Sequence, residues 1–234
     1  MMILLWLGLA LAGAREDLVA ASNKELDEAA RMEAFERLVS LGSTDMGVVL
    51  AMSADPDADV RQRWVAIRAL GRIGGPSARD QLLARLQDDQ PAIRVAAASA
   101  LGDLRDPLAV PPLIKALDDP ALLVRAASAD ALAALADRRA VAALSDALSD
   151  KDGYHRGSSL WVRKHYADAL GSIGDKAALP ALLLALDDPD PSVAEAAVGA
   201  MEQIGGFTFS QGRDAAEERQ AWKRWATNEI KNFR

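Results

Sequence analysis

The stretch Asp88–Leu117, DDQPAIRVAAASALGDLRDPLAVPPLIKAL, is a unit whose pattern recurs along much of the remaining chain, although the individual residues differ. Its Leu101-Gly102 dipeptide has counterparts along the chain. From Leu70 through Leu101, Leu132 and Leu170 to Met201, their starting positions are separated by 31, 31, 38 and 31 residues. A fixed period of this size is typical of a solenoid of stacked helix pairs. The sequence therefore predicts an all-α fold, an α-solenoid of antiparallel helix pairs.

The apolar side chains of this unit follow the spacing of two amphipathic helices. The first helix is expected to bury one face, which consists of Ile93, Ala97, Ala100, Leu101 and Leu104. After a turn at residues 105–107, the second helix is expected to bury Val110, Leu113, Ile114 and Leu117. Neither helix can bury its stripe alone, so stacking of neighbouring units must supply the core.

Composition excludes several classes of function. The chain has 234 residues, half of them hydrophobic, which is enough to bury a sizeable core. It contains no cysteine, so disulfides, zinc–thiolate sites and a thiol nucleophile are excluded. The net charge of -7 disfavours unspecific nucleic-acid binding, which needs an excess of basic side chains. We therefore expect no nucleic-acid partner.

Residues 1–14, MMILLWLGLALAGA, have the apolar character of a signal peptide, and Ala12-Gly13-Ala14 fits a small-x-small cleavage site. No Lys or Arg precedes the apolar run, which departs from the usual pattern. We expect an exported chain in a periplasm or outside the cell. An uncleaved membrane anchor and an N-terminal cap helix are the alternatives.

The remaining chain divides into a cap, a repeat array and a second cap. Residues 15–56 are expected to be N-terminal capping helices, one over 16–41 that ends at Gly42 and one over 46–54. Residues 57–206 are the repeats, which open at Asp57, Asp88, Asp119, Asp150 and Asp188. Residues 207–234 form a C-terminal cap, with a helix over about 215–231 whose Trp222 and Trp225 cover the open end of the last repeat.

The pattern D-x5-R-x6-LG-x-(L/I), followed by a leucine-rich helix, resembles HEAT-type repeats, specifically the short bacterial form named after phycobilisome lyases. The resemblance implies a right-handed superhelix whose second helices line the concave side. It also implies a structural ladder of Asp and Arg side chains that ties neighbouring units together, formed here by Asp57, Arg63, Asp88, Arg94, Asp119, Arg125, Asp150 and Arg163. Such proteins are mainly scaffolds and binding modules, so the resemblance implies little about activity.

The fourth unit carries seven extra residues, an insertion at 151–157, and both histidines and both tyrosines of the chain lie in or beside it. A loop that extends from a rigid array is a reasonable place for recognition, and aromatic and Arg side chains favour binding hot spots. The candidate contacts here are Tyr154, His155, Arg156, Trp161, His165 and Tyr166. The alternative is a neutral surface insertion in which Tyr166 only fills space.

A second candidate surface is the exposed row of the second helices, which becomes nearly uncharged towards the C-terminus. Its members Ala143, Pro180, Ala181 and Leu184 would form an apolar groove for a helix or extended segment of another protein. The alternative is that alanine is present there only as a helix former.

An enzyme or metal-binding protein that uses His155 and His165 is the alternative function. The related deoxyhypusine hydroxylases build iron sites from His-Glu pairs, whereas these histidines are followed by Arg156 and Tyr166. We therefore expect no catalytic residue, no metal and no cofactor. The sequence favours an exported, non-enzymatic scaffold that binds another protein through the concave surface or the 151–163 loop. The membrane would be a partner only if the N-terminal segment is uncleaved.

Overall fold

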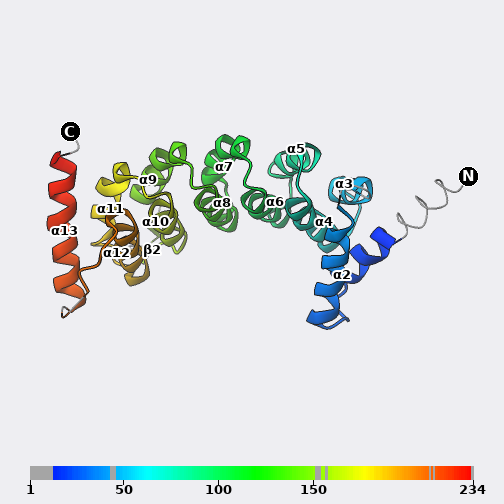
Figure 1. Ribbon diagram of the computed structural model, residues 1–234, viewed down its shortest axis with the longest axis horizontal. Helices are drawn as coiled ribbons and strands as arrows, with labels where there is room; N and C mark the ends of the chain where they lie inside the picture. The colour runs from blue at the N-terminus through cyan, green and yellow to red at the C-terminus, as the bar shows by residue number, and fades with distance from the viewer. Residues whose placement is uncertain are drawn as a thin grey trace, which may run out of the picture. The chain divides into compact units, whose positions relative to one another are not determined.

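The computed structural model describes residues 13–42, 46–150, 154–155, 158–210, 212 and 214–232. The chain forms two compact units, of which one ends at Ala109 and the other begins at Val110. In both units the regular structure is almost entirely helical (Figure 1). The prediction of an all-α fold is confirmed.

The unit that ends at Ala109 is a stack of helices in which α4 packs against α2, α3, α5 and α6. Residues 13–22 are helical, with Ala14 and Leu18 fully buried. The further elements are α2 (Glu28–Ser40), α3 (Met46–Ala54), α4 (Val60–Ile73), α5 (Pro76–Arg85), α6 (Pro91–Leu104) and the 3-10 turn η2 (Pro107–Ala109).

The prediction of one helix over 16–41 is wrong, because residues 23–27 interrupt it. Asn23 accepts a hydrogen bond from the Glu25 backbone N–H, and Asp27 caps α2 by accepting one from the Ala30 N–H. These side chains satisfy backbone donors outside a helix and so favour a break. Helix α3 has the predicted bounds.

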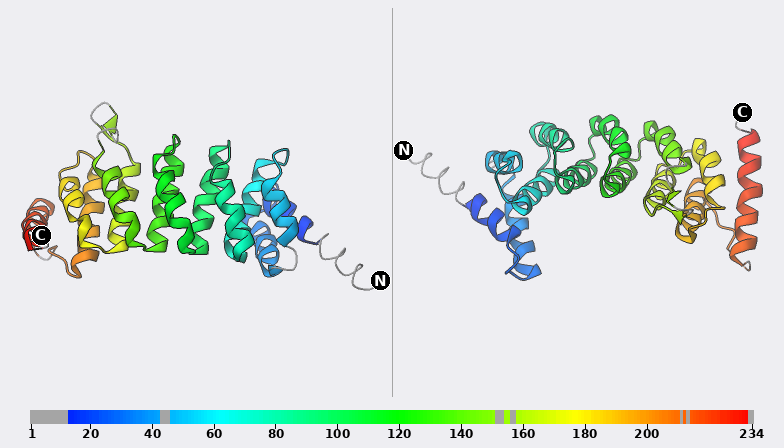
Figure 2. Two further views of the ribbon diagram at one scale, coloured as in Figure 1. Left: turned by 90° about the horizontal axis from the view of Figure 1, so that it is seen from above. Right: turned by 180° about the vertical axis from the view of Figure 1, so that it is seen from behind.

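The second unit continues the pattern of helix pairs (Figure 2). Its elements are α7 (Val110–Lys115), η3 (Ala116–Asp118), α8 (Leu122–Leu135), η4 (Arg138–Ala140), α9 (Val141–Ser149), β1 (Tyr154–His155), β2 (Ser158–Ser159), α10 (Val162–Ile173), η6 (Lys176–Ala178), α11 (Leu179–Ala185), α12 (Pro191–Gly205) and α13 (Ala215–Asn232). Strands β1 and β2 pair antiparallel, with Tyr154 opposite Ser159. Two residues of the insertion predicted from the sequence, Tyr154 and His155, therefore pair with the two serines that follow it.

The glycine of the repeated Leu-Gly dipeptide permits close approach of successive first helices. A Cβ atom added at Gly71 on α4 would lie 2.8 Å from the Cβ of Ala100 on α6. In the second unit, a Cβ at Gly171 on α10 would lie 2.7 Å from the Cα of Ala200 on α12. No side chain fits at either position, so these two glycines are required by the packing, whereas two other repeats have Ala133 and Glu202 at the equivalent position.

The C-terminal segment closes the end of the second unit. Helix α12 ends at Gly205 and is capped by Gly206, whose φ of 74° is left-handed, and the chain continues through two phenylalanines to α13. Trp222 is fully buried; Phe207 stacks on its ring at a centroid distance of 5.2 Å, and Phe209 meets it edge-on at 4.7 Å. Helix α13 packs against α11 and α12. Within the described part of the chain, no helix is both long and apolar enough to cross a membrane.

Candidate functional site

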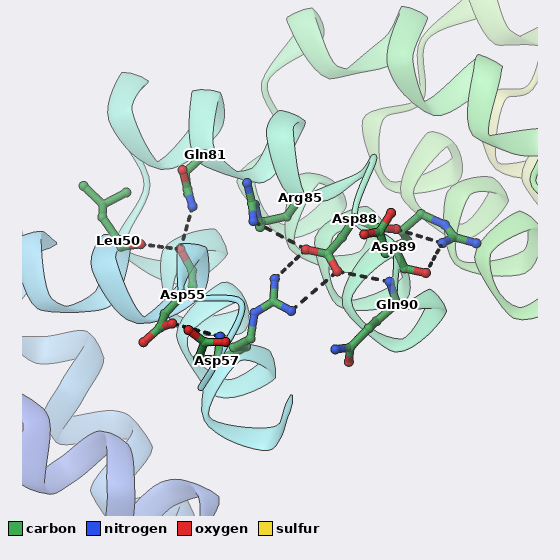
Figure 3. A network of polar contacts seen from close by, with 11 residues as sticks. Leu50, Asp55, Asp57, Gln81, Arg85, Asp88, Asp89 and Gln90 are labelled. Atoms are coloured by element: carbon green, nitrogen blue, oxygen red, sulfur yellow. Dashed lines mark hydrogen bonds and ion pairs between the residues drawn. The ribbon is translucent and has the colours of Figure 1, made fainter. Parts of the chain in front are cut away.

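The Asp/Arg ladder of the first unit joins neighbouring repeats (Figure 3). Arg63 on α4 forms an ion pair with Asp88, 25 residues later, and not with Asp57, six residues earlier. Arg94 donates to the backbone carbonyl oxygens of Asp88 and Asp89 at 2.8 and 3.2 Å. Burial by itself would raise the pKa of Asp88, but the hydrogen bonds from Arg63 and Gln90 lower it. These charges serve packing between repeats.

The second unit repeats these contacts. Arg125 donates to the Asp119 carbonyl oxygen, as Arg94 does to that of Asp88. Arg163 forms a buried ion pair with Asp188 and donates to the Leu148 carbonyl oxygen. Asp150, the remaining ladder residue, is exposed at the end of α9.

A hollow lies between two second helices of the second unit. It has a volume of about 580 Å³ and lies between α7 and α9, and we name it the α7–α9 hollow. Its residues on the two helices include Pro111, Ile114, Lys115, Ala143, Asp146 and Ala147. Asp118 and Asp150 line it where η3 and α9 end. The hollow thus combines small apolar side chains with several carboxylates.

Some of these residues were assigned differently from the sequence. Ile114 was predicted to belong to the core, but it is half-buried and lines the hollow. Asp146 was not predicted as a binding residue, although the sequence sets it apart from its counterparts. The equivalent residues of the other repeats are Ala84, Lys115 and Leu184, so a carboxylate there is not a feature of the repeat.

The predicted apolar row on the second helices is not continuous. Ala143 is half-buried in the α7–α9 hollow, while Pro180 and Leu184 on α11 are exposed, Leu184 by 68%. Ala181 was predicted to be exposed, and this is wrong: it is 6% exposed, on a helix against which α13 packs. The C-terminal helix therefore contacts the helix that was expected to be open.

The residues around the insertion do not form one cluster. Tyr166 on α10 is 3% exposed, so its side chain is buried and is not available to a partner. Burial raises the pKa of Tyr166, which the neighbouring Arg125 guanidinium opposes. The side chains of Tyr154 and His155, and all of Arg156, lie outside what the structure describes.

Trp161 and His165 lie together on the first-helix side. Trp161 is 43% exposed, and its ring meets the His165 ring edge-on with centroids 5.4 Å apart. His165 on α10 shares a 2.8 Å hydrogen bond with Asp130 on α8, which links two neighbouring repeats. This hydrogen bond raises the pKa of His165, while partial burial opposes the shift.

The link between His165 and Asp130 should make stability depend on pH. Because the folded pKa lies above the unfolded value of about 6.5, the stabilisation is present below that pH and is lost as pH rises through the folded pKa. We expect it to be less than about 1 kcal/mol, since both groups are partly exposed. Urea unfolding of wild type and His165→Gln across this range measures it. In an Asp130→Asn background this stabilisation on the acid side should be absent, because the opposing effect of burial on the pKa of His165 remains. The same acid-side stabilisation persisting there would contradict the pairing.

The histidines are not arranged as a metal site in the described part of the chain. No group of three His, Cys, Asp or Glu side chains that could hold a metal ion is present among those residues. The alternative of a site built on His155 and His165 together gains no geometric support, because the His155 side chain is not described.

The fold and these surfaces define a class: the chain is an α-solenoid repeat protein. The model of HEAT repeats matches residues 49–133, 80–162, 112–202 and 154–218, which together span most of the chain. The chain belongs to the HEAT repeat family, as its sequence pattern indicated. No curated protein matches it by sequence.

Solved structures agree with this fold. The chain is similar to the complex of CpcE and CpcF of phycocyanin lyase from a Nostoc species, with 30% identity and a TM-score of 0.61, over 69% of this chain and 65% of that chain. It thus spans less than two thirds of that relative. Kap121p, at 18% identity and a TM-score of 0.60, matches 94% of this chain over 27% of its own length. A designed armadillo repeat protein with a bound peptide, at 20% identity and a TM-score of 0.51, matches 80% of this chain and 98% of its own. The latter two show the fold alone.

Proposed function

We propose that this HEAT repeat protein is a non-enzymatic scaffold that holds a segment of another protein in the α7–α9 hollow. The observation that carries the proposal is the hollow of about 580 Å³ between α7 and α9. The opposite faces of these helices are buried in the core, so the side of each helix that lines the hollow can contact a partner. Ala143 and Ala147 keep it open with short side chains, and Ile114 supplies apolar surface. A concave, partly apolar surface on paired helices suits a partner's helix or extended segment.

Two further observations support a protein partner. The 30%-identical relative from Nostoc is a complex of two protein chains, CpcE and CpcF. In this chain, Asp150 lines the hollow and directly precedes the insertion at 151–157 in the sequence, so the two surfaces expected from the sequence adjoin at that residue. A partner in the hollow would therefore lie next to the start of the insertion.

Site-specific photo-crosslinking tests this function. A photoreactive amino acid at Ala147 should crosslink a partner in an extract of the source cells, whereas the same group at Ser172, exposed on α10, should not. The captured protein is then purified and its affinity for the full chain is measured by calorimetry. Ala143→Phe, which fills the hollow, should weaken binding about tenfold or more. Equal crosslinking at both positions, together with unchanged affinity for the filled variant, would contradict the proposal.

We also propose that the chain is exported by means of residues 1–14. The support is the uncharged apolar run of this segment and its small residues at 12 and 14. We expect the mature protein to begin at Arg15, because a signal peptidase would cut after Ala14. Mass spectrometry of protein purified from its source decides this: an intact N-terminus would favour the membrane anchor or the cap helix.

A further inference from the structure

The charges of the α7–α9 hollow define what kind of segment it can take. Three carboxylates line it, those of Asp118, Asp146 and Asp150, against one ammonium group, that of Lys115. In the part of the chain that the structure describes, neither Asp118, Asp146 nor Lys115 forms an ion pair. Asp150 apart, the hollow therefore presents two carboxylates without an ion pair among the described residues, those of Asp118 and Asp146, against the single ammonium group of Lys115.

Several aspartates elsewhere in the repeats have structural roles that Asp118 and Asp146 lack. Asp88 and Asp188 pair with arginines of the preceding repeat. Asp137 and Asp175 cap the 3-10 turns by accepting a hydrogen bond from the backbone N–H two residues later. Asp118 and Asp146 neither cap a turn nor pair with an arginine, so packing does not account for them.

The residues at the equivalent positions of other repeats also show which of these carboxylates belong to the repeat pattern. Asp118 corresponds to Gln87, Ser149 and Asp187, of which Asp187 pairs with Lys223 of α13. Asp146 corresponds to uncharged or basic residues in every other repeat that has this helix. Asp146 is therefore the carboxylate that is particular to this hollow, whereas Asp118 has an acidic counterpart in Asp187 and Asp150 has one in every repeat.

We infer that the α7–α9 hollow selects a segment of a partner protein that carries a Lys or Arg side chain beside small aliphatic residues. The inference rests on the proposed function and specifies its ligand. The basic group would lie between the carboxylates of Asp146 and Asp118. The aliphatic neighbours would contact Ile114, Ala143 and Ala147, which are half-buried and present apolar atoms. A phosphate-bearing ligand is disfavoured by the same carboxylates.

Selection from a displayed library of random short peptides, with the full chain as the target, tests the inference. Enriched peptides should contain Lys or Arg next to aliphatic residues, and their binding should weaken on raising the salt concentration to about 0.3 M. Asp146→Lys should weaken binding about tenfold or more. Asp89→Lys, the same charge change at an exposed aspartate that does not line the hollow, should have little effect.

A charge swap completes the test. A peptide whose basic residue is replaced by Glu should lose affinity for wild type and regain it for Asp146→Lys. If Ala143→Phe abolishes binding while Asp146→Lys does not, the charge inference is overturned and the proposed function stands. If neither substitution changes binding, the peptides bind elsewhere and both are overturned. Enrichment of acidic peptides, or of none, overturns the inference.

Circular dichroism confirms that each variant is folded. If Ala143→Phe does not fold, Ala147→Leu replaces it as the variant that fills the hollow.

Discussion

Asp188→Ala is expected to lower the free energy of unfolding by about 3–5 kcal/mol, because it leaves a buried guanidinium without its carboxylate. The Arg163 side chain is 4% exposed and that of Asp188 is fully buried, so water cannot replace the lost partner. The Leu148 carbonyl oxygen still accepts from Arg163 but does not neutralise its charge. Urea unfolding followed by circular dichroism measures the loss.

Two comparisons give this prediction its controls. Lys164→Ala removes an exposed i,i+4 pair with Asp168 on the same helix as Arg163, and should cost only about 0.3–0.5 kcal/mol. The double variant Arg163→Met/Asp188→Leu should recover much of the lost stability, since no buried charge remains. A single variant as stable as wild type would show that the pair is not buried as the structure has it.

Gly171→Leu is expected to destabilise the second unit by about 3 kcal/mol or more, since it forces apart two helices that meet through backbone. The added Cβ atom would lie 2.7 Å from the Cα of Ala200, and a backbone atom cannot rotate away as a side-chain end can. Helix α12 must then shift away from α10, which weakens the contacts of the last repeat and of α13 with it. Urea unfolding and hydrogen exchange of α12 amides should both report the change.

Gly199 provides the matched control on α12 itself. A Cβ atom there would meet nothing within 4 Å, so Gly199→Ala should raise stability by about 0.5–1 kcal/mol through helix propensity. Stability changes of opposite sign for the two substitutions would confirm that Gly171 is required for the close approach of the helices and not for helix propensity. Equal effects would contradict the close contact.

Features that depend on local signals were predicted well from the sequence. The predicted bounds of α3 and the predicted beginning of α13 at Ala215 agree with the structure. Each is marked by nearby residues: a glycine that takes a left-handed conformation, or a change in apolar spacing. The break at 23–27 was missed although Asn23 and Asp27 mark it, because the surrounding residues continue to favour a helix.

The candidate site was predicted less well. The second-helix row did include Ala143, which lines the α7–α9 hollow, but Ala181 was wrongly placed on the open surface and Tyr166 among the partner contacts. Spacing tells which residues share a helix face, but not which neighbouring helix covers that face. Exposure at these positions depends on helices that are distant in sequence.

By itself, the sequence determined that this chain is an α-solenoid of HEAT repeats. The reason is that each repeat of about 31 residues contains the same local helix signals and the same apolar stripe. Only the tertiary structure decided which charges are used in packing. Asp88 and Asp188 meet arginines 25 residues earlier, whereas Asp118 and Asp146 lie beside a hollow without an ion-pair partner among the described residues. The physical reason is that a carboxylate has the same chemistry in every repeat, and its role depends on which side chains the fold places within reach.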